Sequence, residues 1–215
     1  MGKHKMKKIK ALSVSAGEAA KFASRLAMAD AFKLVLKGLQ VDLEDPNLID
    51  TPMRVVDSLF EMCYGHIDTE IRIADIMKAK FPADGYDEMI VERKIVTNSL
   101  CPHHVLPIRY RMTIGYVPNK AYYVIGISKL ARVAELLSAR LVMQEQLVMD
   151  IADAVNSYLK PFGVGVVVVG EHGCMTCRGV KQRETDLVTT RLIGVFRQAP
   201  VRQEFLAAAG ILNHG

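Results

Sequence analysis

The chain has 215 residues, of which 50% are hydrophobic and 24% charged, the composition of a globular protein with one substantial core and not of a disordered or fibrous chain. The net charge of +5 comes from the segment MGKHKMKKIK at residues 1–10, because the rest of the chain balances lysine and arginine against aspartate and glutamate. A nucleic-acid-binding protein needs basic side chains spread over a folded surface, so the sequence argues against a nucleic-acid partner.

The sequence also argues against a membrane protein. It has no run of about 18 or more apolar residues, the length that a membrane-spanning helix requires. No apolar segment of signal-peptide type follows the basic start, and Met6 stands where a myristoylation motif needs Ser or Thr. We therefore expect a cytoplasmic protein whose residues 1–15 form a basic disordered tail.

The first part of the chain has the pattern of helices. Ser15 and Glu18 have the spacing of a capping box before apolar residues at helical intervals, which predicts a helix over residues 16–37. Thr51 as N-cap and Pro52 at the first helical position predict a second helix that runs to about Cys63. We predict an N-terminal helical region over residues 16–88.

From residue 89 onwards the pattern changes to that of strands and helices in alternation. A turn at Pro118-Asn119-Lys120 separates two of the strands, and Ser128 is expected to cap the first helix after them. The expected strands cover residues 89–96, 105–117, 122–127, 164–169 and 187–196, and the expected helices cover 128–137, 143–159 and 201–209. This order indicates an α+β fold with an antiparallel sheet over residues 89–215.

Two segments combine thiols with imidazoles. Ser99-Leu-Cys101-Pro-His103-His104 joins two predicted strands, and Glu171-His172-Gly-Cys174-Met-Thr-Cys177-Arg178 follows the valine-rich strand. Side chains at the ends of neighbouring strands can converge on one metal ion, and mixed sulfur and nitrogen donors favour zinc. The cysteines of this chain therefore fit a metal site better than a disulfide framework.

Two interpretations of this zinc site remain open from the sequence. The candidate ligands are Cys101, His104, Cys174 and Cys177. If all four bind, the site is closed and structural; if only three bind, a water of lowered pKa, about 7, occupies the open position and can act as a nucleophile. Spacing alone favours the closed site. His103 and His172 are not needed as ligands and can transfer protons near neutral pH, which favours catalysis over their alternative role as solvated or supporting side chains.

Several separate motifs resemble the GTP cyclohydrolase I family in their order and spacing, over about residues 20–208. They are Cys101–His104, Ile114–Lys120, Gly126–Arg132, Gln144-Glu145, His172–Cys174, Arg178-Gly179 and Gly194–Phe196. The resemblance implies a tunnelling fold (T-fold), with an antiparallel sheet and two helices per subunit that assemble into a barrel. It further implies a homo-oligomer, usually a decamer of two pentamers, with active sites between subunits.

The resemblance also implies an activity: zinc-dependent opening of the guanine ring of GTP, which gives formate and 7,8-dihydroneopterin triphosphate. The implied zinc ligands are Cys101, His104 and Cys174. His172 would protonate the purine nitrogen beside the attacked carbon, His103 would assist proton transfer, and Ser128 would act in the later ribose steps.

The substrate-binding residues are assigned by the same resemblance. The implied phosphate-binding residues are Arg54, Lys129, Arg132 and Arg178, whose positive groups suit phosphate oxygens. Glu145, with Gln144, would accept hydrogen bonds from the N–H groups of guanine. Considered singly, each charged residue has the alternative of being a solvated surface side chain.

The chain departs from the family pattern at several positions. Pro102 replaces a glutamate, Gln146 replaces an arginine, and residues 183–190 hold fewer small hydroxyl side chains. Cys177 could close the zinc site, pair with Cys174 in a redox-sensitive manner, or simply pack. These departures keep two alternatives open: a divergent purine-nucleotide cyclohydrolase with a different product, and a non-catalytic structural-zinc module. The resemblance leaves three alternatives for the pathway served: folate, biopterin or deazapurine synthesis.

Overall fold

The structure is a computed structural model that describes the backbone of residues 16–119 and 121–211, with side chains from residue 23 onwards. The predicted basic tail and Lys120 of the predicted turn lie outside the described residues. The chain divides into two compact units, and the boundary falls between Phe60 and Glu61.

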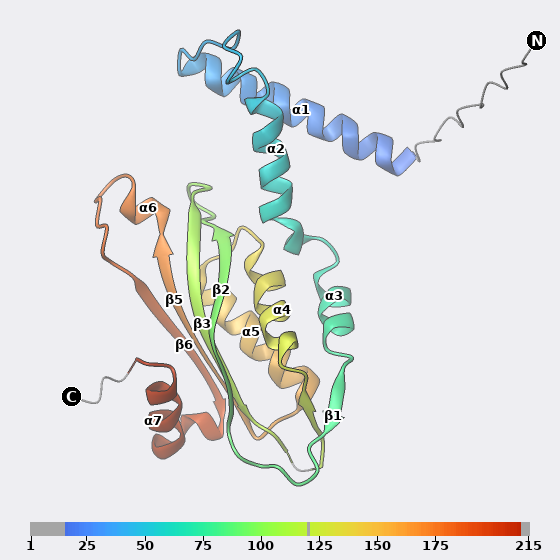
Figure 1. Cartoon of the computed structure of the whole chain (residues 1–215), viewed down its shortest axis with the longest axis vertical. Coiled ribbons are helices and arrows are strands. Elements are labelled where there is room, and N and C mark those ends of the chain that lie inside the picture. The colour runs from blue at the N-terminus through green and yellow to red at the C-terminus, as the bar shows by residue number, and fades with distance from the viewer. Residues whose placement is uncertain (1–15, 120, 212–215) are drawn as a thin grey trace, which may run out of the picture. The chain divides into compact units, whose positions relative to one another are not determined.

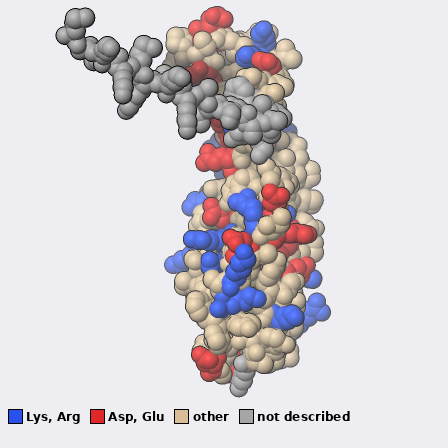
Figure 2. Space-filling model, turned by 90° about the vertical axis from the view of Figure 1, so that its right-hand side faces the viewer, with Lys and Arg blue, Asp and Glu red and all other residues tan. Residues whose placement is uncertain are grey.

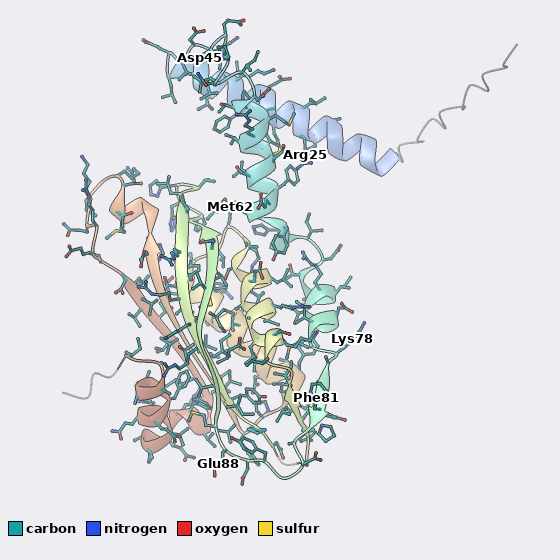
Figure 3. All side chains as sticks on the ribbon, viewed as in Figure 1. Arg25, Asp45, Met62, Lys78, Phe81 and Glu88 are labelled. Atoms are coloured by element: carbon teal, nitrogen blue, oxygen red, sulfur yellow. The ribbon has the colours of Figure 1, made fainter. Side chains whose placement is uncertain are left out.

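The first unit is helical, as predicted. It contains α1 (Ala16–Gly38) and most of α2 (Thr51–Met62). Arg25 of α1 forms an ion pair with Asp57 of α2 at 3.0 Å, and its guanidinium lies 4.5 Å from the centroid of the Phe60 ring (Figure 3). The prediction of Thr51 as N-cap was one residue late, because the Arg54 N–H already donates to the Asp50 carbonyl at 3.0 Å and Thr51 is the first helical residue.

The second unit holds the sheet and its helices (Figure 1). Its helical elements are η1 (Tyr64–His66), α3 (Thr69–Ile76), α4 (Ser128–Ser138), α5 (Gln144–Leu159), α6 (Gly173–Thr176), η2 (Val195–Arg197) and α7 (Ala199–Ala208). Its strands are β1 (Lys80–Pro82), β2 (Ile90–Leu100), β3 (Pro107–Val117), β4 (Tyr123–Ile125), β5 (Gly163–His172) and β6 (Leu187–Gly194). The short α3 lies within the helical region predicted over residues 16–88, although no pattern specified its bounds, and the short β1 and α6 were not predicted. The helix that begins at Ser128 is confirmed, but no side-chain hydrogen bond caps it.

The main sheet has the order β2-β3-β5-β6, with every neighbouring pair antiparallel, and β1 pairs with β4 in a separate two-stranded sheet. Helices α4 and α5 cover one face of the main sheet, and α7 lies against the other face (Figure 1). The predicted α+β class, with an antiparallel sheet and two helices, is therefore confirmed.

The valine run of β5 is explained by this two-sided covering. Val164, Val166 and Val168 belong to the core shared with α4 and α5, whereas Val167 packs with Phe196 and Phe205 on the α7 side. Alternate residues of a strand point to opposite faces, so a strand covered on both faces is apolar throughout. The same covering holds β5 at the centre of the unit.

The α7 side packs two aromatic rings onto strand glycines. The Phe196 and Phe205 rings meet edge to face, with centroids 5.1 Å apart and planes at 80°, and both rings are fully buried. A Cβ placed on Gly165 would lie 2.4 Å from Phe196 and 2.7 Å from Phe205, which is too close for either ring. Glycine at this strand position is therefore what lets the two rings reach the sheet.

The surface mixes charges of both signs. On the face shown in Figure 2, Lys and Arg are interspersed with Asp and Glu. Exposed ion pairs join strand residues, as between Arg111 and Glu171 at 3.0 Å. Among the helices of the described residues, none has the combination of length and apolar character that crossing a bilayer demands.

The packing at Gly165 generates a stability prediction. Gly165→Ala should lower the free energy of unfolding by about 1–3 kcal/mol, because the added methyl group overfills the site under the two phenylalanine rings. Thermal denaturation of the purified protein measures the effect. Gly126→Ala is the matched control, because its added Cβ would make only ordinary contacts, the nearest at 3.6 Å. Equal melting temperatures for the two variants would contradict the packing argument.

Candidate metal centre and active site

Strand pairing brings the two thiol- and imidazole-bearing segments to one end of the sheet. Leu100 of β2 pairs with Pro107 of β3, and Ile108 pairs with His172 at the end of β5. The loop between β2 and β3 is a tight one, in which the Cys101 N–H donates to the Leu106 carbonyl at 2.8 Å. Cys101 therefore lies close to the segment that follows β5.

Three side chains from these segments form one potential metal centre. The ligand atoms of Cys101, His104 and Cys174 all lie within 4.8 Å of one another. Tetrahedral zinc, with bonds of about 2.0–2.3 Å, separates its donors by roughly 3.3–3.8 Å, so small side-chain shifts are enough for all three to bind. Cys101 is buried and His104 is exposed, so the centre is closed on the protein side and faces solvent at the imidazole.

Cys174 reaches the centre because the chain turns sharply after β5. A Cβ on Gly173 would lie 2.7 Å from the Pro107 carbonyl, so this glycine permits the close approach of α6 to the start of β3. Burial raises the pKa of the Cys174 thiol, and the neighbouring Cys101 sulfur raises it further, while the charge of Arg178 opposes both effects. A divalent cation between the two sulfurs would remove this repulsion, since it binds the thiolate form.

Cys177 is not part of this group in the described residues. Its thiol is exposed and donates to the Gly173 carbonyl at 2.7 Å, within the single turn of α6. Three protein donors leave a fourth position for another molecule, which is the arrangement of catalytic zinc sites. Of the two interpretations drawn from the sequence, the geometry favours the open site.

His172 is held firmly beside the centre. Its Nε2 lies 2.8 Å from Oε1 of Gln144, and the Tyr110 ring meets it edge to face at a centroid distance of 6.2 Å. Burial lowers the pKa of His172, and the Glu145 carboxylate acts in the opposite direction. The uncharged imidazole is therefore the resting form at neutral pH.

The exposed side of the centre carries two further predicted residues. The His103 ring is exposed, with Nδ1 3.7 Å from the Cys101 sulfur. The Arg178 guanidinium donates to Nε2 of His104 at 3.0 Å. The structure thus places a positive group at the solvent-facing edge of the metal centre.

The catalytic and phosphate-binding residues predicted at the start of α4 are not brought to the metal centre of their own chain. Ser128, Lys129 and Arg132 lie in its first turns. The chain beyond its last residue, Ser138, runs along β2 towards Cys101, with a bridge between Leu141 and Leu100. A helix of 11 residues is about 15 Å long, so the two groups occupy opposite ends of α4 within one chain. Arg54 belongs to the first unit, where it is exposed and forms an ion pair with Asp50 at 3.1 Å.

The sequence pattern did not identify Gly170 and Thr189, which lie against the Gln144 side chain that holds His172. Gly170 lies under the Gln144 side chain, and Thr189 of β6 lies 3.1 Å from the Gln144 amide nitrogen. A glycine directly after a run of valines in a strand is a signal of close packing that could have identified Gly170. Nothing in the sequence pattern points to Thr189.

Comparison with known proteins identifies relatives of this chain. The GTP cyclohydrolase I family profile matches residues 28–210. GTP cyclohydrolase 1 of Saccharomyces cerevisiae is 41% identical over 180 residues, which cover 84% of this chain and 72% of that protein. GTP cyclohydrolase 1 of Synechococcus sp. is 36% identical over 206 residues, which cover 94% and 88%. One solved structure, the apo form of the archaeosine synthase QueF-Like, is 17% identical in sequence, and the alignment covers 51% of this chain and 94% of that chain. Its TM-score is 0.39, which is too low for any argument about the site.

An antiparallel sheet backed by two helices, with thiol and imidazole side chains gathered at one end, defines an α+β protein with a candidate metal centre. The chain belongs to the GTP cyclohydrolase I family. The resemblance drawn from the sequence motifs is thereby confirmed.

The three-donor geometry predicts how zinc content responds to the cysteines. Cys177→Ser should retain zinc, because its thiol contacts only the Gly173 carbonyl, whereas Cys174→Ser should lose most of it. Metal analysis after dialysis measures both variants. Loss of zinc from Cys177→Ser would show instead that the site is closed by four ligands.

The raised pKa of Cys174 predicts proton release on metal binding. The thiol is protonated at pH 7 in the metal-free protein, so zinc binding must displace its proton, and affinity should fall as the pH falls. Titration calorimetry of the metal-free protein, in buffers of different ionisation enthalpy, counts the protons. A zinc affinity independent of pH between 6 and 8 would contradict this prediction.

Proposed function

We propose that this chain is a GTP cyclohydrolase I, which opens the guanine ring of GTP by hydrolysis and gives formate and 7,8-dihydroneopterin triphosphate. One observation carries the proposal: Cys101, His104 and Cys174 form a three-donor group with His172 beside it, in a chain of this family. Zinc is the proposed metal, because two thiols and an imidazole suit it.

Zinc bound at these donors would supply Lewis acidity, which lowers the pKa of a water molecule to about 7 and so provides a nucleophile at neutral pH. His172 is proposed to give a proton to the purine nitrogen next to the attacked carbon. Because its resting form is uncharged, it must first take a proton, and the attacking water can supply one. His103, exposed beside Cys101, is proposed to pass protons to solvent.

The substrate is proposed to lie between α5 and the turn at α6. Glu145 is exposed in the first turn of α5, next to Gln144, and its carboxylate can accept from the ring N–H and amino group of guanine. Arg178, beyond α6, is exposed and can bind phosphate oxygens in a bidentate manner. In this proposal the base lies against the start of α5 and the triphosphate lies near Arg178.

The separation along α4 supports an active site shared between subunits. Ser128, Lys129 and Arg132 stand at the end of α4 away from the metal centre, so we propose that the two groups of one chain do not meet on the same GTP molecule. A neighbouring copy can supply the second group across a heterologous interface, which closes into a ring. We propose a homo-oligomer of this kind, with the decamer of two pentamers as its specific form. Cytoplasmic location stays a prediction.

The proposed reaction is tested by incubating the purified, reduced protein with GTP and measuring formate and, after oxidation, neopterin triphosphate by chromatography. Both products should appear, disappear after chelator treatment and return with added zinc. Formate without pterin would support the alternative of a divergent cyclohydrolase. That alternative is considered because Pro102, next to the metal ligand Cys101, departs from the family pattern. Absence of both products from a folded, zinc-loaded protein would reject the proposed activity.

The role of His172 predicts a separation of binding from turnover. His172→Ala should keep zinc and GTP affinity while turnover falls by roughly 10²–10⁴-fold, the range typical of a general acid. Metal analysis, equilibrium dialysis with GTP and single-turnover formate release measure the three quantities. If the variant lost zinc, His172 would have to be counted among the ligands.

A shared site predicts complementation between two inactive variants. His172→Ala removes the proposed general acid from the half of the site that holds the metal. Arg132→Ala removes a proposed phosphate-binding residue from the half that α4 of a neighbouring copy supplies. Each variant alone should therefore be nearly inactive. When the two are co-expressed, a random mixture leaves about one quarter of the shared sites intact, because each site takes its two halves from different chains. Co-purified oligomers should regain roughly that fraction of wild-type activity. No recovery in oligomers shown to contain both variants would contradict a shared site.

A further inference from the structure

We infer that Gln144 is a positioning residue for His172: it holds Nε2 of the imidazole, so that Nδ1 is the nitrogen that exchanges a proton with the substrate. This inference rests on the proposed function and differs from the sequence-based assignment of Gln144 to guanine binding. The hydrogen bond from His172 Nε2 to Gln144 Oε1 is 2.8 Å long.

The orientation of the Gln144 amide is fixed by its other contacts. Its Nε2 donates to the Val168 carbonyl at 3.0 Å and to the Leu187 carbonyl at 2.8 Å, and lies 3.1 Å from Oγ1 of Thr189. Carbonyl oxygens only accept, so the amide nitrogen must face them and the amide oxygen must face His172. An amide oxygen also only accepts, and His172 must therefore donate through Nε2–H.

This contact selects one tautomer of the uncharged imidazole. With the hydrogen on Nε2, the other ring nitrogen carries a lone pair and is free to take and return a proton. The half-buried ring is further restrained by the edge-to-face contact with Tyr110. Gln144 thus acts on the reaction through His172.

Gly170 leaves the space that the amide group of Gln144 occupies. A Cβ at this position would lie 2.2 Å from Oε1 of Gln144 and 2.9 Å from the Tyr110 ring. Only the end of the glutamine side chain is flexible enough to move, so any larger residue at 170 would push the amide away from its place. The strand glycine therefore holds open the space in which Gln144 meets His172.

Burial argues against a direct contact between Gln144 and guanine. The side chain is 1% exposed, and both ends of its amide are occupied by protein groups. Glu145, the next residue, is exposed and has no such constraint. The two adjacent residues therefore have separate tasks: Glu145 faces the base and Gln144 supports the acid.

The test uses the full-length, zinc-loaded protein and two substitutions that disturb the contact in different ways. Gln144→Met removes the amide at similar size, and Gly170→Ala retains the amide but displaces it. Each should lower kcat for formate release by about 10–100-fold, part of the 10²–10⁴-fold range of a general acid, with KM for GTP changed less than threefold. Gln203→Met, an exposed position on α7, is the control and should match the wild type.

A double-mutant cycle identifies the partner. In the His172→Ala background, neither substitution should slow turnover further by more than about twofold, because the residue through which they act is already absent. Independently of turnover, ¹⁵N shifts of labelled histidine, with His172 assigned by its loss in His172→Ala, should show the Nε2–H tautomer in the wild type and a mixture in Gln144→Met.

The outcomes separate this inference from the proposed function. If the wild type releases no formate from GTP, the proposed function fails, and the ¹⁵N shifts alone decide whether Gln144 holds the ring. If Gln144→Met weakens GTP binding at least tenfold in the His172→Ala background, guanine contact is correct and positioning is wrong. If both variants keep full kcat, the inference is overturned. Should Gln144→Met fail to fold, as thermal denaturation would reveal, Gly170→Ala carries the test.

Discussion

The register of β3 between β2 and β5 is the constraint on which the site depends. It pairs Leu100 with Pro107 and Ile108 with His172, so the ends of β2 and β5 meet at one edge of the sheet. Alternate residues of β3 are buried against α4 and α5, and a slip of one residue would turn that whole set to the opposite face. The hydrophobic core thus fixes the separation of the cysteines, although none of its strand residues is a ligand.

Much of the fold was predictable because its long elements have clear periods. The valine strand and the helices at Ser128–Ser138 and Gln144–Leu159 follow directly from apolar spacing. The short α3, β1 and α6 were not predictable, since elements of eight residues or fewer carry little periodic signal and β1 needs a partner far along the chain. Tertiary contacts, and not local propensity, decide such elements.

In the candidate site, the metal ligands were predictable from the sequence, but the situations of Cys177 and Gln144 were not. Residue type and spacing identified Cys101, His104 and Cys174, because metal ligands must be thiols or imidazoles wherever the fold places them. The sequence could not exclude Cys177, whose thiol is held by a backbone carbonyl within α6. Nor could it show that Gln144 is buried, since neighbouring residues of a helix point in directions about 100° apart and only the packed structure tells which one faces inwards.

The length of helix α4 restricts the sequence changes that this chain can accept. Its last residue contacts Thr97 of β2, the strand that leads to Cys101, and its first residues are Ser128 and Lys129, so the helix sets the distance between these two places. A single inserted residue would lengthen it by about 1.5 Å and rotate one end by about 100° relative to the other. Its exposed side chains can be exchanged one at a time, whereas insertions and deletions would put one end out of alignment. We expect the length of α4 to be far more restricted in evolution than its surface composition.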